Sequence, residues 1–213
     1  MSPGPTFDRG YLALKDQLRS GRHPPGAHLE PAALGDELSS SITPVRDALH
    51  RLAGERLVEA PRNDGFRAPI ITELVLRQLY LWQADLLRLA ATRAKAEVQM
   101  GRRARDGAAE DETATLPDLF TALGRASGNW ELLAALANAC DRLASARLLE
   151  ERFLTDLTEE LGRFRASMAH GDLAGLKPAI TAYHKRRHRI VPQLVDALQR
   201  SSDLANNRII PSV

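Results

Sequence analysis

The sequence predicts a mainly helical protein of two modules, a small N-terminal domain of three helices and a hairpin followed by an all-helical bundle. Composition favours helices, because the chain is 44% hydrophobic but only 5% aromatic and is rich in Leu, Ala, Arg and Glu. Apolar residues recur at helical spacing over most of its length. A length of 213 residues allows a small core beside a larger one.

The first predicted helix ends at Ser20-Gly21, a glycine stop, and its apolar residues lie three and four apart, Tyr11, Leu14 and Leu18. The segment HPPGAHLEP follows, and its prolines and glycine exclude a continued helix. A short second helix is then expected from its apolar residues, Ala33, Leu34 and Leu38.

The third predicted helix begins in residues 40–52, SSITPVRDALHRL. Ser41 and Thr43 can cap it, with Pro44 at the first helical position, where a missing N–H costs nothing. Its buried face is expected to hold Val45, Leu49 and Leu52, and its opposite face Thr43, Arg46, Asp47 and His50. The helix is expected to end near Glu55.

Residues 56–71, RLVEAPRNDGFRAPII, change period and predict a two-stranded hairpin. The turn Pro-Arg-Asn-Asp-Gly separates its apolar residues, Leu57 and Val58 on one side and Phe66, Ala68 and Ile70 on the other. Three helices followed by a hairpin is the order of a winged helix-turn-helix domain, in which the hairpin is the wing.

Residues 18–67 resemble the DNA-binding domain of the GntR family nearly end to end. The matching features are Gly21, Pro25-Gly26, Leu29, the run SITPVRDAL at 41–49, Arg51-Leu52 and Gly65. Two positions depart from the family pattern. Arg56 stands where the family usually has the glycine that ends the recognition helix, and Ala32 stands where some members carry a phosphate-contacting arginine.

A recognition helix enters the major groove with its N-terminal residues nearest the base edges. Arg46 is expected to reach a guanine or a phosphate, and Arg62 to enter the adjacent minor groove. The residues predicted to contact DNA are Ser41, Thr43, Arg46, His50, Arg51, Arg62, Asn63 and Gly65. The alternative is that Ser41 and Thr43 only cap the helix and Arg46 pairs with a carboxylate. The net charge does not distinguish these two interpretations, because residues 1–71 hold nine Lys/Arg and nine Asp/Glu and so carry no net charge.

The second module is expected over residues 72–200, after a DNA-binding domain at 1–71 and before a tail at 201–213. A Thr72 cap starts a helix of up to eight turns, and the polar stretch 101–115 has no apolar period and predicts a loop. Further helices are expected at 116–127, 129–152, 154–170 and 173–199. Pro178 and Pro192 predict a break near 174–178 and a bend near 188–192 in the last one, with His184 pointing into the bundle.

This module is similar to the effector domain of the FadR branch of the family, the FCD domain. The resemblance implies an all-helical bundle that binds small acids, often through a metal held by an Asp and three His. In this chain Leu116, Phe120 and Leu161 fall at three of those positions, and only His184 lies near the fourth. No metal and no cofactor is therefore expected. The predicted effector pocket comprises Gln83, Leu87, Leu116, Phe120, Leu161 and His184.

His184 and His188 lie four residues apart and could bind a soft metal, but they belong to YHKRRHR, interpreted as a solvated basic run. The lone Cys140 predicts a buried, inert thiol.

The leading hypothesis is a dimeric transcription regulator, a repressor, that binds operator DNA and responds to a small organic-acid or apolar effector. The alternative is a ligand-independent repressor whose helical domain only dimerises. No motif of an enzyme is present in the sequence. The lack of a long apolar stretch predicts a cytoplasmic protein with no membrane span.

Overall fold

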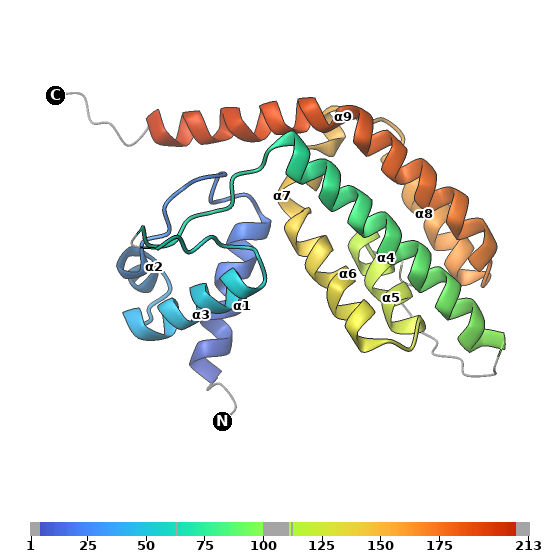
Figure 1. Cartoon of the computed structure of the whole chain (residues 1–213), viewed down its shortest axis with the longest axis horizontal. Coiled ribbons are helices and arrows are strands. Elements are labelled where there is room, and N and C mark those ends of the chain that lie inside the picture. Colours follow the sequence, from blue (N-terminus) through green and yellow to red (C-terminus); the bar gives the residue numbers. More distant parts are fainter. Residues whose placement is uncertain (1–4, 63, 100–110, 112, 208–213) are drawn as a thin grey trace. The chain divides into compact units, whose positions relative to one another are not determined.

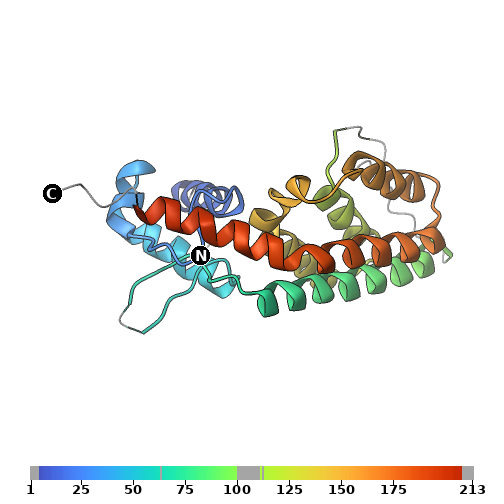
Figure 2. The ribbon, with the colours of Figure 1, turned by 90° about the horizontal axis from the view of Figure 1, so that it is seen from above.

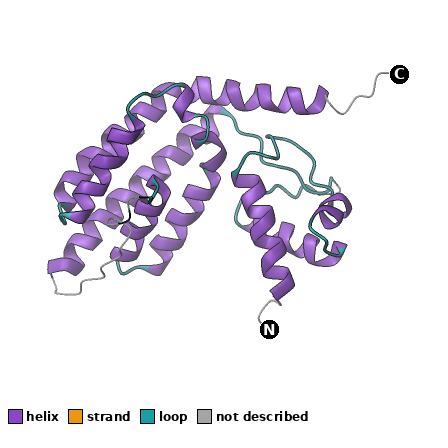
Figure 3. Cartoon of the chain, turned by 180° about the vertical axis from the view of Figure 1, so that it is seen from behind, coloured by secondary structure: helices purple, strands orange, loops and turns teal. Residues whose placement is uncertain are grey.

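The computed structural model describes residues 5–62, 64–99, 111 and 113–207, and it is mainly helical, as predicted (Figures 1 and 3). The chain divides into two compact units. The first comprises residues 1–72, 144–149 and 193–213, and the second comprises residues 73–143 and 150–192. None of the helices among the described residues is long and apolar enough to cross a membrane.

Three helices near the predicted positions build the first unit: α1 (Pro5–Arg19), α2 (Pro31–Glu37) and α3 (Ile42–Gly54). Both α1 and α2 pack against α3. The buried core contains most of the apolar residues predicted for α1 and α3, while the predicted Leu18 is only partly buried against it. The core residues, which also come from α2 and the loops, include Tyr11, Leu14, Leu29, Leu34, Val45, Ala48, Leu49, Leu52, Leu57, Val58 and Phe66. Burial of these side chains fixes α3 against α1 and α2 and leaves the opposite face of α3 exposed.

The turn between α2 and α3 is tight and depends on Gly35. The N–H of Ser40 donates to the carbonyl of Gly35 at 2.9 Å. A Cβ atom on residue 35 would lie 2.8 Å from the carbonyl oxygen of Ser40, closer than real contacts allow. This glycine therefore lets the backbone of the helix-turn-helix close, which no motif in the sequence indicated.

Helix α3 begins two residues earlier than predicted. Its N-cap is Ser41 and its first helical residue is Ile42, so Pro44 occupies the third helical position rather than the first. A proline is tolerated there because the first four N–H groups of a helix have no partner within the helix. The side chain of Ser41 makes no capping hydrogen bond.

The predicted hairpin is present as a wing but has no regular strand in the described residues. A single antiparallel bridge joins Glu59 and Arg67, through backbone hydrogen bonds of 2.8 and 2.9 Å. Arg67 also bridges to His28, and the N–H of Leu29 donates to the carbonyl of Phe66 at 2.8 Å. The wing is thus a loop fixed at its base by the segment that precedes α2.

The end of α3 carries strain. The N–H of Leu57 donates to the carbonyl of Leu52, and that of Arg56 to the carbonyl of Ala53. These two bonds define a Schellman motif, which places Arg56 at a left-handed φ of 59°. Helix α1 ends in the same way with Gly21 at φ 71°, where the absence of a Cβ removes the strain.

We predict that Arg56→Gly stabilises the protein by about 0.5–1 kcal/mol, because glycine adopts this conformation without the Cβ penalty. Urea unfolding of the full chain measures the change. Arg56→Ala is the matched control, since it removes the long side chain but keeps the Cβ atom. An equal gain from both substitutions would show that the side chain, not the backbone, carries the cost.

The second unit is a bundle of α4 (Glu73–Gln99), α5 (Leu116–Ala126), α6 (Trp130–Arg142), α8 (Leu157–Ala169) and the first part of α9 (Leu173–Asn207). The single helix predicted at 129–152 is wrong, because α6 is followed by α7 (Ala144–Arg147) and a short 3-10 helix, η2 (Glu150–Arg152). Helix α9 extends to Asn207 rather than ending at 199. The loop predicted at 101–115 lies mostly outside the described residues, as does 208–213 of the tail.

The break predicted in the last helix is wrong, because α9 is one continuous helix that includes both Pro178 and Pro192. The helix is not interrupted at the predicted bend either. Pro192 has no N–H to donate to the carbonyl of His188, four residues before it. The Nη1 of Arg77 on α4 donates to that carbonyl instead, at 2.9 Å. Figures 1 and 2 show the first part of α9 running alongside α4. A side chain from a neighbouring helix thus satisfies the group that the proline leaves free.

We predict that Arg77→Ala destabilises the protein by about 1–2 kcal/mol, because the partly buried carbonyl of His188 loses its donor. In a Pro192→Ala background the new N–H can take over, so the same substitution should cost less. A double-mutant cycle by urea unfolding measures this coupling. Arg88→Ala, which removes an ion pair with Asp85 within α4, should cost the same in both backgrounds. Equal costs for Arg77→Ala would contradict the explanation.

Candidate nucleic-acid interface

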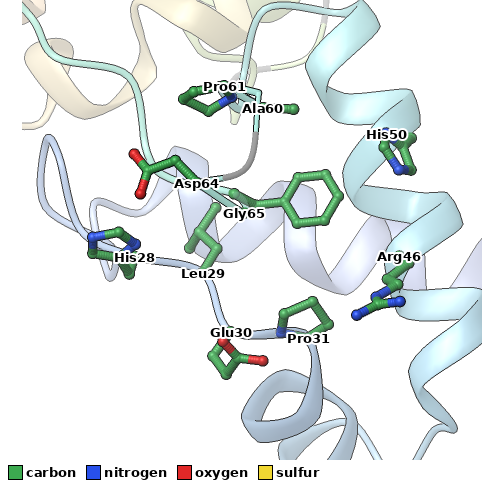
Figure 4. Close-up of a pocket in the computed structure, with 11 residues that line it drawn as sticks. His28, Leu29, Glu30, Pro31, Arg46, His50, Ala60, Pro61, Asp64 and Gly65 are labelled. Carbon is green, nitrogen blue, oxygen red and sulfur yellow. The ribbon is translucent and has the colours of Figure 1, made fainter.

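A groove of about 550 Å³ lies between α3 and the wing in the first unit (Figure 4). Arg46 and His50 on α3 line one side, and His28, Asp64 and Gly65 line the other. The base of the wing sets its width, because the bridge to His28 fixes the wing against the segment before α2. The structure therefore brings the exposed face predicted for α3 together with the wing.

The N-terminal end of α3 presents groups that are free to bind a ligand. Ser41, Thr43 and Arg46 are exposed. Within the described residues no carboxylate lies within ion-pair distance of Arg46, and the hydroxyl of Ser41 makes no cap. The geometry therefore does not favour the alternative in which Arg46 is paired and Ser41 is only a cap. Free hydroxyls, free N–H groups and a guanidinium at a helix N-terminus together suit a phosphate and a base edge.

His50 is exposed one helical turn after Arg46 and is held in position by the wing. Its ring meets the ring of Phe66 edge to face, with centroids 4.9 Å apart and planes at 75°. Phe66 is itself part of the buried core. This contact fixes the imidazole at the mouth of the groove, where either ring nitrogen can meet a base edge.

Arg51 is placed differently from the other predicted contacts. Its guanidinium carbon lies 3.9 Å from the centroid of the Tyr11 ring, and its nitrogens lie 3.6 Å from Glu55 and 3.9 Å from Asp8. Tyr11 donates its hydroxyl to Glu55 at 2.7 Å, and Lys15 also reaches Glu55 at 2.9 Å. Burial acts to raise the pKa of Glu55, but these two hydrogen bonds lower it overall. Arg51 thus belongs to a cluster that joins α1 to the end of α3.

The tip of the wing is exposed on both described sides of residue 63. Arg62 has no ion-pair partner in the described part of the wing, and Gly65 has a φ of 65°, which permits the turn. Asn63 lies outside the described residues. The wing tip is therefore a free cation on a turn, as the minor-groove prediction requires.

Carboxylates also line this groove. Glu30 and Asp64 belong to its lining, and Asp47 is exposed beside Arg46 on α3. The surface is consequently not a uniformly positive patch, in agreement with the zero net charge of residues 1–71. A polyanion would be held here by a few free arginines and the helix end, while the carboxylates can accept from a cytosine amino group.

The interior of the second unit contains most of the residues predicted to line an effector pocket. Gln83, Leu87, Phe120 and His184 are buried, while Leu116 and Leu161 are only partly buried. Phe120 packs edge to face against two rings that the sequence analysis did not assign, Phe164 and Tyr183, with centroids 5.4 Å apart in both pairs. The Nε2 of Gln83 donates to the Sγ of Cys140 at 3.4 Å, and Cys140 is buried as predicted.

A buried ion-pair network fills the neighbouring space. The Nη2 of Arg187 lies 2.7 Å from Glu150, and its Nη1 lies 2.7 Å from Glu160. Tyr80 donates its hydroxyl to Glu150 at 2.9 Å, and the guanidinium of Arg187 stacks 3.4 Å from the ring centroid of Tyr183. Burial acts to lower the pKa of Arg187, but Tyr183 and Glu150 act in the opposite direction and raise it. We call Arg187, Glu150 and Glu160 the buried triad.

The buried triad corrects the interpretation of YHKRRHR as a solvated run, because Arg187 is fully buried and His184 nearly so. Sequence analysis missed the triad. One signal was available, since Tyr183, Arg187, Val191 and Leu194 lie four, four and three residues apart on one face of α9. An arginine at a core position of a helix requires a buried acidic partner.

His184 points into the bundle, as predicted, although the proposed irregularity near Pro178 is not the reason. Its Nδ1 lies 2.7 Å from the carbonyl of Ile180, so Nδ1 carries the hydrogen and donates it. Its Nε2 is buried and has no hydrogen-bond partner among the described residues. Within those residues no group of three or more His, Cys, Asp or Glu side chains could hold a metal ion. His184 is therefore a buried, neutral imidazole whose Nε2 can accept a hydrogen bond.

Comparisons with known proteins found one family model and several similar structures. Residues 8–67 match the family of bacterial regulatory proteins named the gntR family. No curated protein sequence matches the chain significantly. The solved structure of Escherichia coli McbR/YncC is similar over 90% of this chain and 99% of its own, at 20% identity and a TM-score of 0.63. A GntR transcriptional regulator from Rhodococcus sp. RHA1 is similar over 88% and 97%, at 15% identity and a TM-score of 0.65. At these identities the similarity shows the fold, over most of the chain.

We predict that the stability of the protein falls as the pH drops below about 6.5, in part because of His184. Burial is the main cause that lowers the pKa of His184 from 6.5 to about 3. Between these values the unfolded chain binds a proton that the folded chain does not, so His184 alone should remove about 1.4 kcal/mol per pH unit. The stability is fully present above pH 6.5.

Urea unfolding at pH 7.5, 6.0 and 5.0 measures this slope. His184→Gln should flatten it, whereas His170→Gln, at an exposed histidine, should leave it as in the wild type. A slope that both variants share with the wild type would show that the titration of His184 is not involved.

Proposed function

We propose that this chain, whose residues 8–67 are a DNA-binding domain of the GntR family, is a dimeric repressor that binds operator DNA through α3 and the wing. The second unit is proposed to be an effector domain of the FadR (FCD) type, and the protein to act in the cytoplasm. Binding of a small organic-acid or apolar effector there would change the spacing or mobility of the two DNA-binding domains. Because the proposed dimer is two-fold symmetric, its operator half-sites should be related by the same symmetry.

The observation that carries the proposal is the exposed end of α3 beside the groove. Arg46 projects there without a carboxylate partner in the described chain, next to Ser41 and Thr43 with free hydroxyls. An unpaired arginine can donate two hydrogen bonds to the O6 and N7 of guanine, the commonest specific contact in the major groove. The hydroxyls and the first N–H groups of α3 would then hold a phosphate of the same strand.

The two halves of the groove have different proposed roles. His50, held by Phe66, would contact the base pair next to the one read by Arg46, since one helical turn separates them. Arg62 at the tip of the wing would enter the adjacent minor groove, and Gly65, with its φ of 65°, permits the turn beside it. We do not include Arg51 among the base contacts, because its guanidinium is stacked on Tyr11 and lies near Glu55.

A second candidate function is favoured by the interior of the bundle. Arg187 is paired with both Glu150 and Glu160 and stacks on Tyr183, so an acidic effector would have to displace one of these carboxylates from Arg187. This supports a ligand-independent repressor whose second unit only dimerises. Polar atoms that an effector could still engage include the Nε2 of His184 and the Oε1 of Gln83, both buried without a hydrogen-bond partner in the described chain.

Selection of bound DNA from a random pool tests the proposal and separates its two forms. The full chain should enrich a two-fold symmetric sequence. Repeating the selection with a panel of short-chain carboxylic acids and apolar metabolites should change the affinity for that sequence if an effector acts. Failure to enrich any sequence would refute the DNA-binding proposal, whereas an affinity that no compound changes would favour the ligand-independent form.

We predict that Arg46→Ala weakens binding to the selected operator by about 1–3 kcal/mol and relaxes the preference at one base pair in each half-site. Arg51→Ala is the matched control on the same helix. It should lower the stability of the domain, by loss of the contacts to Tyr11 and Glu55, and leave the base preferences unchanged. Quantitative binding to all single-base variants of the operator measures both. A relaxed preference in Arg51→Ala would reverse the assignment.

A further inference from the structure

The first turn of α3 carries an apolar side chain that the core of the first unit does not take up. Ile42, the first helical residue of α3, is 47% exposed and does not belong to the buried core of that unit. A helix start does not favour isoleucine, because a β-branched apolar side chain cannot cap a free N–H group and has a lower helix propensity than leucine or alanine. Packing and helix formation therefore do not explain why an isoleucine stands here.

Ile42 lies in line with two residues of the groove beside the wing. Ile42, Arg46 and His50 follow one another at intervals of four residues, which brings their side chains onto one side of α3, one turn apart. Arg46 and His50 line the groove (Figure 4). We call these three residues the α3 row. The row begins with an apolar group at the N-terminal end of the helix and continues with a guanidinium and an imidazole.

An apolar group at the start of this row matches one feature of the major groove. Base edges there present hydrogen-bond donors and acceptors, and the C5-methyl group of thymine is the apolar group among them. An isoleucine packed on that methyl removes two apolar surfaces from water. The same side chain beside an amino group of cytosine or adenine would cover a donor that water otherwise satisfies, which is unfavourable. Ile42 can therefore distinguish thymine from other bases.

We propose that Ile42 reads the methyl group of a thymine in each operator half-site. The inference rests on the DNA-binding function proposed above and adds a base that no other contact of the groove identifies. Four residues of helix span about 6 Å, or about two base-pair steps of roughly 3.4 Å, so the thymine lies within two base pairs of the guanine assigned to Arg46. His50 is at the other end of the row, so the thymine and the base pair near His50 lie on opposite sides of that guanine.

Removal of single methyl groups from the selected operator tests the contact. Each thymine is replaced in turn by deoxyuridine, which keeps the base pair and its hydrogen-bonding groups but lacks the C5-methyl. Within two base pairs of the position whose preference Arg46→Ala relaxes, one replacement in a half-site should weaken binding of the wild-type chain about threefold to tenfold. Ile42→Ala should bind the thymine and deoxyuridine operators equally, because its side chain no longer reaches the methyl.

Ile70→Ala is the matched control, at an isoleucine that is 51% exposed and lies outside α3. It should keep the wild-type response to deoxyuridine. Each variant is compared with itself on two DNAs, so the ratio holds even if part of the protein is unfolded. Should Ile42→Ala not fold, Ile42→Val keeps part of the apolar contact and should show a reduced preference for thymine. A wild type that is insensitive to every such replacement, or an Ile42→Ala variant that keeps the full preference, would overturn the proposal.

Methylation of cytosine gives an independent measurement of the same contact. An operator with cytosine at the thymine position is compared with one that carries 5-methylcytosine there, so that the two DNAs differ only in the methyl group. The wild type should bind the 5-methylcytosine operator more tightly, whereas Ile42→Ala should bind both equally. Equal binding of both operators by the wild type would contradict a methyl contact.

These outcomes can be told apart from those of the DNA-binding proposal. If the chain selects a two-fold symmetric operator but no methyl replacement near the Arg46 position changes its affinity, the inference fails and the proposed function stands. If the chain enriches no sequence at all, the proposed function fails, and the inference fails with it.

Discussion

A positive charge buried in the second unit determines how that unit is built. Arg187 is fully buried on α9, and an unpaired guanidinium there would cost several kcal/mol. Glu150 from η2 and Glu160 from α8 both reach it, and Tyr80 from α4 holds Glu150. One arginine thereby fixes the positions of three other elements. Removal of either glutamate would leave a buried charge without a partner. The packing of α4, η2, α8 and α9 around Arg187 should therefore be cooperative.

The same network limits what the bundle can bind. Acidic groups of the chain itself already occupy the guanidinium, and aromatic rings fill the space beside it. A bundle of this kind gains specificity of packing from its buried charges rather than a large net stability. Among the described residues, the buried polar atoms without a hydrogen-bond partner include an imidazole nitrogen of His184 and an amide oxygen of Gln83. A hydrogen-bond donor would suit both atoms, because the Nδ1 of His184 already carries the ring hydrogen.

Local patterns in the sequence predicted most of the fold, and long-range contacts account for what they missed. The helices of the first unit followed from apolar spacing and glycine stops, because both are read within a few residues. The burial of Arg187 was missed because Glu150 and Glu160 lie far from it in sequence. The continuity of α9 through Pro192 was missed for the same reason, since Arg77 is 111 residues from the carbonyl that it satisfies. For the groove, the sequence predicted which side chains could contact DNA, but it could not show that Arg51 stacks on Tyr11 and lies near Glu55.

The acidic residues beside the groove bear on how such a protein would find its site in a genome. A strongly basic domain spends most of its time on random DNA, because phosphate attraction is the same everywhere. Here Glu30 and Asp64 lie among the lining residues, and the domain carries no net charge. Contacts with random sequences should therefore be brief, and the search should proceed mainly by repeated dissociation and rebinding rather than by long sliding. Occupancy would then depend on the few contacts that only the correct sequence completes.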